Sequence, residues 1–139
     1  MRITTAMLAN HAEVREGVLF VSGGSPEWWC IPEPPPTVGM ILLVLVVEWD
    51  PDELDQAFDI RVLLVRPSGE DHAHQSLSLF RKPSGDYVAG APMYRHLVYQ
   101  FPIKFWEVGR HSLRIMLRAE ELALVHFGVR VLLPLPEGY

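Results

Sequence analysis

An uninterrupted run of apolar residues from Met40 to Val47 constrains this chain more than any other feature of its sequence. Eight residues are too few for a membrane-spanning helix, which needs about 20, but they fit a buried β-strand. Alternate side chains of a strand point to opposite faces. One face would carry Ile41, Leu43, Leu45 and Val47, and the other Met40, Leu42, Val44 and Val46.

Both faces of this strand therefore need cover. Burial of one large aliphatic side chain contributes about 1.5–3 kcal/mol. Four such side chains on the outer face amount to about 6–12 kcal/mol, which is comparable with the net stability of a whole domain at about 5–15 kcal/mol. A two-layer sandwich ordinarily leaves the outer face of each sheet in water. We expect the cover to be the loop at 28–36, the segment at 50–58 or a second protein chain.

Shorter segments of alternating apolar residues recur along the rest of the chain, separated by Gly and Pro. They predict strands at 2–9, 18–22, 40–48, 59–66, 75–81, 95–101, 112–118 and 122–133, with a loop at 25–37. The predicted fold class is all-β: an antiparallel β-sandwich of seven to eight strands, as a single domain over residues 1–139. Asp50, Pro51 and Glu53 resemble a capped helix start, so we expect at most one short helix near 51–57.

Two points near the end of the chain stay open or irregular. Residues 119–125 form either the return of a hairpin or a short helix, and we favour the hairpin. The alternation of the last strand changes parity between Leu124 and Phe127, which predicts a bulge or bend near 126–128.

Composition excludes several classes of function. Twelve Lys and Arg against 17 Asp and Glu give a net charge of −5, which argues against a non-specific nucleic-acid binder and a polybasic membrane-surface protein. A single cysteine cannot form an internal disulfide, and the N-terminal segment does not resemble a secretory signal. We expect a cytoplasmic protein without nucleic-acid or membrane partners.

Two short blocks of sequence carry a resemblance to a known family. Residues 2–10, read as RITTAMLAN, are followed by EGVLFVSGG at residues 16–24. The chain resembles a family of small bacterial proteins of unknown function in these blocks, in its length, in the Pro-bearing loop and in the closing hairpin. The resemblance implies an all-β domain in a bacterial cytoplasm, and it implies no catalytic residue. The turn at 118–121 departs from it, because the Asp-Gly that such hairpins favour is missing.

No catalytic, cofactor or metal motif stands out. His72 and His74 have the spacing of two metal ligands on a strand, but they follow the loop-like Pro67-Ser68-Gly69 and lack a third ligand, so we expect solvated loop histidines. Cys30 lies between Trp29 and Ile31, and we expect it to be a small apolar side chain. We therefore predict a protein that is not an enzyme and binds no cofactor or metal.

The adjacent Trp28 and Trp29 point to opposite sides of an extended chain, so both can hardly enter one core. Each either caps the sandwich, contacts a protein partner or forms a platform for a ligand. Our first hypothesis is an interaction module that self-associates, as a homo-oligomer, or docks into a larger bacterial protein assembly. Its candidate contact residues are Trp28, Trp29, Met40, Leu42, Val44 and Val46. The alternative is a β-sandwich that binds a small ligand or a carbohydrate through Trp28 or Trp29.

Overall fold

The computed structural model describes residues 1–69, 71–82, 85 and 88–132, and for residues 71–74 it describes the backbone alone. This part of the chain forms nine strands and one turn of 3-10 helix. In chain order the elements are β1 (Arg2–Arg15), β2 (Val18–Gly24), β3 (Trp28–Ile31), β4 (Thr37–Trp49), η1 (Pro51–Glu53), β5 (Ala57–Val65), β6 (Asp71–Phe80), β7 (Met93–Phe105), β8 (Gly109–Leu117) and β9 (Glu120–Val131).

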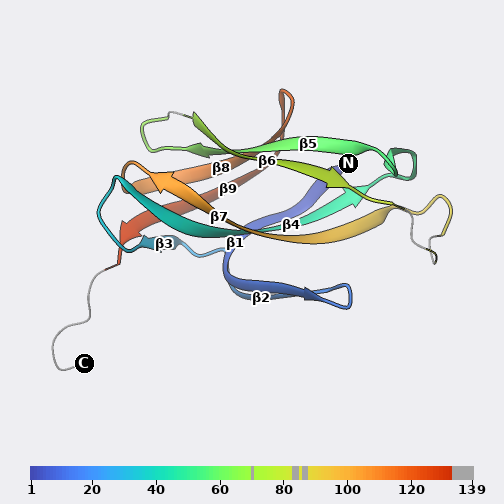
Figure 1. The fold of residues 1–139 in the computed structure, drawn as a ribbon, viewed down its shortest axis with the longest axis horizontal. Coiled ribbons are helices and arrows are strands. Elements are labelled where there is room, and N and C mark those ends of the chain that lie inside the picture. The colour runs from blue at the N-terminus through green and yellow to red at the C-terminus, as the bar shows by residue number, and fades with distance from the viewer. Residues whose placement is uncertain (70, 83–84, 86–87, 133–139) are drawn as a thin grey trace.

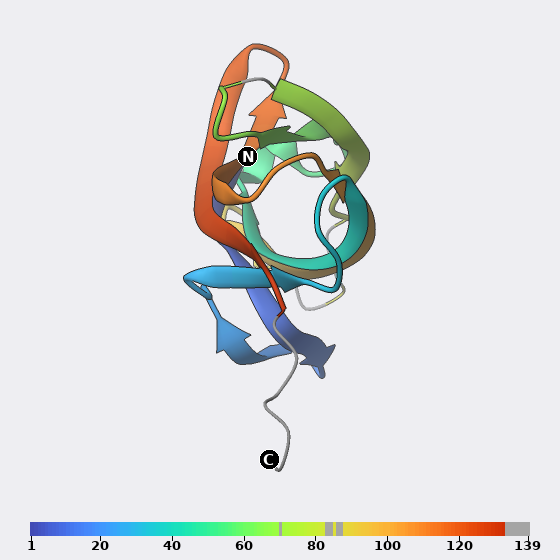
Figure 2. The same ribbon diagram turned by 90° about the vertical axis from the view of Figure 1, so that its left-hand side faces the viewer.

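The strands form two sheets around one core. The four-stranded sheet has the order β2-β1-β4-β7, and the five-stranded sheet has the order β3-β9-β8-β5-β6. Figure 1 shows the two layers along the long axis of the molecule, and the end view in Figure 2 shows them curving around a common interior. The predicted β-sandwich is confirmed, with nine strands in the described residues rather than seven to eight.

β4 supplies the centre of the core. Its inward side chains pack against those of the opposite sheet, and five of them are fully buried: Ile41, Leu43, Leu45, Val47 and Trp49. β4 lies between β1 and β7, with Leu43 opposite both Leu8 and Tyr99. The apolar inner face predicted for this strand is therefore confirmed.

β1 belongs to two pairings. Its first half pairs with β4 as far as Leu8, and its second half, from Ala9, pairs with β2. The turn to β2 consists of Glu16 and Gly17, both with positive φ, at 50° and 75°. Positive φ at both central residues is the condition for the two-residue turn that matches strand twist. We call residues 9–24 the β1–β2 hairpin, and Figure 2 shows it projecting beneath the ring of the two sheets.

β3 is the strand that the sequence interpretation missed, because we assigned residues 25–37 to a loop. β3 runs parallel to β9, with Trp28 opposite Gly128 and Ile31 opposite Val131. All the other pairs among the described strands are antiparallel. The Gly128 N–H donates to the Glu27 carbonyl at 2.8 Å, which fixes the start of this pairing.

The short helix near 51–57 is confirmed as one turn of 3-10 helix at Pro51–Glu53. Pro51 occupies its first position, where no intrahelical N–H bond is needed. The Glu53 carboxylate accepts a hydrogen bond from the Asp50 N–H at 3.0 Å and also contacts the amino group of Met1. This corner therefore holds the first residue of the chain against the end of β4.

The chain from β8 to β9 makes a hairpin, not a helix. Leu117 pairs with Glu120 across the two residues 118 and 119, and Arg118 has a φ of 55°. The predicted bulge near 126–128 is wrong in its position. The register is continuous there and shifts instead between Ile115 and Met116, which leaves Leu122 of β9 as the extra residue.

Candidate functional site

The outer face of β4 is covered by the β1–β2 hairpin. Val44 is fully buried there with Ala9 and Ala12, while Leu19 and Leu42 pack around this second, smaller cluster. The small alanines let the hairpin approach the sheet closely. The cover is therefore part of this chain, and it is none of the three covers that we expected.

This arrangement corrects the set of candidate contact residues. Val44 is inside the molecule and is not available to a partner, and Leu42 and Val46 are half-buried. Met40 differs from them because it is 49% exposed. The hairpin thus covers one half of this face of the four-stranded sheet and leaves the other half open.

The uncovered half presents a strip of apolar side chains. Val38 is 57% exposed next to Met40 on the same face of β4, and Pro102 of β7 is exposed opposite Met40. We call Val38, Met40 and Pro102 the apolar strip. At its end, the Lys104 ammonium lies 4.0 Å from the centroid of the Trp106 ring, which is a cation–π geometry.

The two adjacent tryptophans lie on opposite sides of β3, as predicted. Trp29 is half-buried against the main core, and its indole Nε1–H donates to the Met40 carbonyl at 3.1 Å. This bond ties β3 to β4 at the point where the two sheets meet. Trp29 is therefore a core and edge residue, and its ring offers no open platform.

Trp28 lies on the outer face of the five-stranded sheet, over Gly128. A methyl group built on Gly128 would come within 2.5–3.1 Å of three adjacent carbons of the indole ring, so the ring covers the backbone where a side chain would otherwise stand. Trp28 remains 37% exposed. The guanidinium groups of Arg110 and Arg130 each lie 5.6 Å from the ring centroid. We call Trp28, Arg110 and Arg130 the Arg–Trp–Arg cluster.

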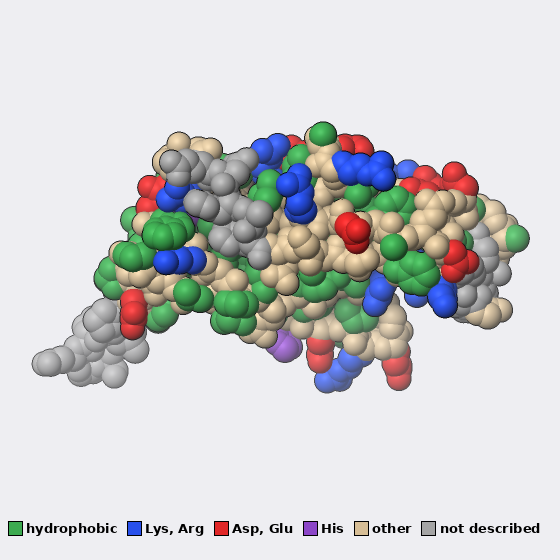
Figure 3. All heavy atoms as spheres, turned by 45° about the horizontal axis from the view of Figure 1, so that its top comes forward, with side chains coloured by type: hydrophobic (Ala, Val, Ile, Leu, Met, Phe, Trp, Pro, Cys, Tyr) green, Lys and Arg blue, Asp and Glu red, His purple; other side chains and the backbone are tan. Residues whose placement is uncertain are grey.

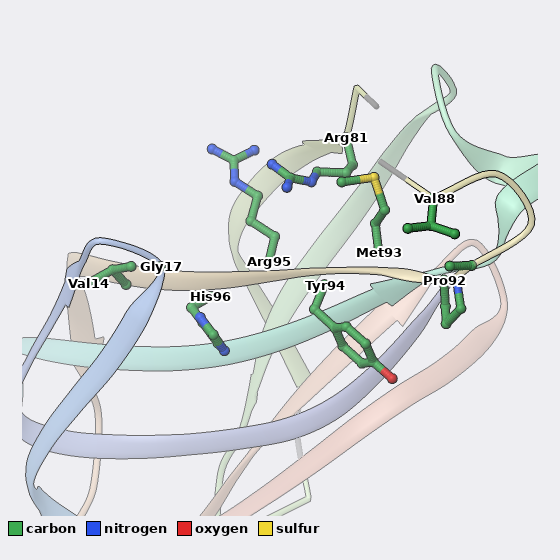
Figure 4. A pocket seen from close by; sticks show the side chains of 10 residues that line it. Val14, Gly17, Arg81, Val88, Pro92, Met93, Tyr94, Arg95 and His96 are labelled. Atoms are coloured by element: carbon green, nitrogen blue, oxygen red, sulfur yellow. The ribbon is translucent and has the colours of Figure 1, made fainter. Parts of the chain in front are cut away.

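A wide, open hollow of about 740 Å³ runs along the start of β7 near the tip of the β1–β2 hairpin. Figure 4 shows Arg81, Arg95 and Met93 on one side of the β7 ribbon and Tyr94 and His96 on the other. Adjacent strand residues point to opposite faces, so the lining residues do not converge on one ligand. The Arg95 guanidinium is also engaged, because it donates to the Phe80 carbonyl at 3.1 Å.

His111 is buried between aromatic side chains of the core. His111 lies between Phe105 and Phe127, each with its ring centroid 5.9 Å away, and its Nδ1–H donates to the Gly109 carbonyl at 2.9 Å. Burial lowers the pKa of His111 below its ordinary value. The imidazole therefore packs inside the fold as a structural group, and it does not line the hollow at the start of β7.

The other predicted features are placed as follows. Cys30, expected to be a small apolar side chain, is exposed on the outer face of β3, which it shares with Trp28. His72 and His74 belong to β6 and not to a loop, and their side chains lie outside the described part of the structure. Among the described residues, no group of three or more His, Cys, Asp or Glu side chains could hold a metal ion.

Charged side chains are mixed with apolar ones on the face of the molecule that Figure 3 shows. On the face shown in Figure 3, Lys and Arg side chains are scattered among hydrophobic and acidic ones and do not gather into one field. No helix in the described residues is long and apolar enough to cross a membrane.

Comparison with known proteins identifies no family. No family model and no curated protein matches the chain. One similar solved structure is the Pseudomonas fluorescens alkylpurine DNA glycosylase AlkC bound to DNA with an abasic site analogue, at 17% identity and a TM-score of 0.44. The match covers 76% of this chain but only 28% of the glycosylase chain.

A second similar structure is an immunoglobulin-like protein from Pseudomonas aeruginosa, at 16% identity and a TM-score of 0.35. The match covers 93% of this chain and 95% of that protein. At these TM-scores neither likeness indicates a function for this chain.

Sequence reasoning singled out Trp28 but missed its surroundings. Arg110 and Arg130 are 20 residues apart in the sequence, and both are over 80 residues from Trp28. The available signal was Gly128, which the sequence interpretation assigned to a bulge. A glycine in a strand interior also marks the close approach of another group, and here that group is the indole ring.

Proposed function

We propose that the protein is a non-enzymatic interaction module that self-associates through the apolar strip. The observation that carries this proposal is the position of Val38 and Met40, each about half exposed, on one face of β4, with the exposed Pro102 opposite Met40. Contiguous exposed apolar residues mark interaction surfaces, whereas scattered ones need no explanation.

A second copy of this chain is the partner that we propose for the strip. Two identical strips can meet about a two-fold axis, so that each side chain finds an apolar counterpart on the other copy. The Lys104–Trp106 pair stands at the end of the strip and supplies a polar border, as interface rims do. The lone exposed Cys30 is consistent with a reducing, cytoplasmic location, which is part of the proposal.

Light scattering after size exclusion tests self-association from micromolar to millimolar concentration. We expect the mass to rise from the 15.8 kDa monomer toward twice that value. Met40→Lys should keep the chain monomeric, because its ammonium would be desolvated at the interface. Val18→Lys is the matched control, since Val18 is 53% exposed on β2, outside the strip.

The control variant should therefore associate like the unmodified chain. A chain that stays at 15.8 kDa at every concentration would refute the proposal. Equal loss of association in Met40→Lys and Val18→Lys would refute the assignment of the interface to the strip.

The second candidate function is the binding of a small ligand on Trp28, and it rests on a separate surface. The indole lies flat over Gly128 and stays partly exposed, so its outer face is a ready platform. Trp29 drops out of this alternative, because its ring is half-buried and its N–H is bonded to Met40. Titration with small ligands, followed by the NMR signal of the Trp28 indole N–H, separates this function from self-association.

A further inference from the structure

The Trp28 ring packs directly on the backbone at Gly128, because this glycine has no side chain. Three ring carbons, Cε3, Cζ3 and Cδ2, lie at 2.5, 2.7 and 3.1 Å from the position that a Cβ of Gly128 would take. Such similar distances to three adjacent carbons place the glycine below a ring face and not at a ring edge. One face of the indole is thus occupied by the sheet, and the other face is the one that a ligand can meet.

Two positive charges flank this ring. Arg110 belongs to β8 and Arg130 to β9, and each guanidinium carbon lies 5.6 Å from the ring centroid. The two guanidinium groups are therefore no further apart than twice that distance, so both border the same exposed ring. Guanidinium groups bind carboxylate and phosphate through paired, directed hydrogen bonds.

The charge of these arginines is only partly satisfied within the chain. The nearest carboxylate oxygen of Glu27 lies 3.6 Å from Arg110, and both side chains are about two-thirds exposed. Arg130 has no ion pair among the residues that the structure describes, and its guanidinium contacts the Trp28 ring. Glu27 shows that a carboxylate can approach this cluster, and it leaves the second cation for a ligand.

An apolar recess adjoins the second cation. Arg130 lines a hollow of about 280 Å³ together with Cys30, Val131 and Leu132, and Leu132 is 61% exposed. Cys30 lies directly opposite Arg130 in the β3–β9 pair. A ligand that places its anionic group on the arginines would therefore find apolar surface on the indole, with the exposed Leu132 nearby.

We propose that the Arg–Trp–Arg cluster binds a small organic anion, in which a carboxylate or phosphate group is attached to a flat apolar body. The guanidinium groups of Arg110 and Arg130 bind the anionic group, and the flat body stacks on the open face of Trp28. The inference rests on the second candidate function and replaces its carbohydrate ligand, because a neutral sugar uses neither positive charge. It is independent of self-association through the apolar strip.

The test uses the full chain labelled with ¹⁵N and follows the indole N–H signals, of which the four tryptophans give one each. Loss of one signal in Trp28→Phe assigns the Trp28 resonance. The probes are benzoate and phenyl phosphate, with benzamide as the flat neutral control and inorganic phosphate as the anion without a flat body. We expect saturable shifts of the Trp28 signal with both aromatic anions that weaken as sodium chloride is added.

Arg130→Gln should weaken the binding of both aromatic anions about tenfold, because it removes one charge-assisted contact. Arg61→Gln is the matched control: Arg61 lies on β5 of the same sheet and donates to the Arg118 carbonyl, outside the cluster. It should leave the affinity unchanged. A stronger response to one of the two aromatic anions identifies the anionic group that the site prefers.

Two results overturn the inference, and they have different consequences for the second candidate function. If benzamide binds as tightly as benzoate and Arg130→Gln has no effect, the anion class is wrong and a neutral ligand on Trp28 stays in place. If none of the four probes moves the Trp28 signal up to tens of millimolar, the anion site and the platform function both fail.

Discussion

Replacement of Val44 by threonine tests the internal cover of the four-stranded sheet. Threonine has nearly the same shape as valine but puts a hydroxyl in place of a methyl group. Val44 is 0% exposed beneath the β1–β2 hairpin. Transfer of an unpaired hydroxyl into an apolar site costs about 1–3 kcal/mol by protein mutational data, so Val44→Thr should lower the free energy of unfolding by that amount.

Val38→Thr is the matched control for this prediction. Val38 lies on the same face of the same strand, beyond the hairpin, and is 57% exposed. A substitution at such a position usually changes the free energy of unfolding by no more than about 0.5 kcal/mol. Because Val38 also belongs to the apolar strip, both variants are compared at a low concentration at which the chain is monomeric, and they then differ in whether the hairpin covers the substituted side chain.

Urea unfolding followed by far-ultraviolet circular dichroism measures both variants, and the slope of free energy against urea should stay that of the unmodified chain. Amide exchange adds a local readout, because a loosened hairpin exposes the amides of residues 9–15 before the rest of the fold opens. Equal destabilisation by Val44→Thr and Val38→Thr would refute the reasoning, since it would mean that the hairpin does not shield Val44.

Three further predictions concern other parts of the sandwich. Gly128→Ala should displace the Trp28 ring and lower the free energy of unfolding by about 1–3 kcal/mol. Urea unfolding measures the loss, and the NMR signal of the Trp28 indole N–H should shift. An unchanged signal would contradict the ring position described above. Trp29→Phe should cost about 1 kcal/mol, because it removes the hydrogen bond to the Met40 carbonyl; unchanged stability would contradict a role for that bond.

The third concerns pH: burial lowers the pKa of His111 in the fold, so below its ordinary value of about 6.5 the unfolded chain binds more protons. The stability tied to this group should therefore be complete above that pH and decline as the pH falls toward the lowered pKa. His111→Phe should flatten this part of the pH dependence, and an unchanged profile would show that another group causes it.

The all-β fold class could be predicted from the residues whose apolar side chains alternate along the chain. The apolar run at 40–47 predicted a central strand, and the structure extends it to Thr37–Trp49 at the heart of the core. What the sequence did not reveal was the cover on its outer face. Ala9 and Ala12 carry little apolar surface, so nothing in their pattern distinguishes close packing on Val44 from an exposed strand.

Only part of the Arg–Trp–Arg cluster could be predicted from the sequence. Trp28 could be recognised from its neighbour Trp29, because adjacent residues of an extended chain must diverge. The arginines around it could not be recognised, since their approach depends on the parallel pairing of β3 with β9. The prolines after β3 hid that pairing by making the whole segment resemble a loop.

The position of β9 in the chain has a consequence for synthesis on the ribosome. β9 lies between β3 and β8 in its sheet, so residues 28–31 have no strand neighbour in that sheet until residues 128–131 have left the exit tunnel. Loop closure over about a hundred residues is slow compared with closure of a local hairpin. The nascent chain must therefore carry an unmatched Trp28–Ile31 segment until about a hundred further residues have been synthesised, and during that time its exposed edge is open to contacts with other chains.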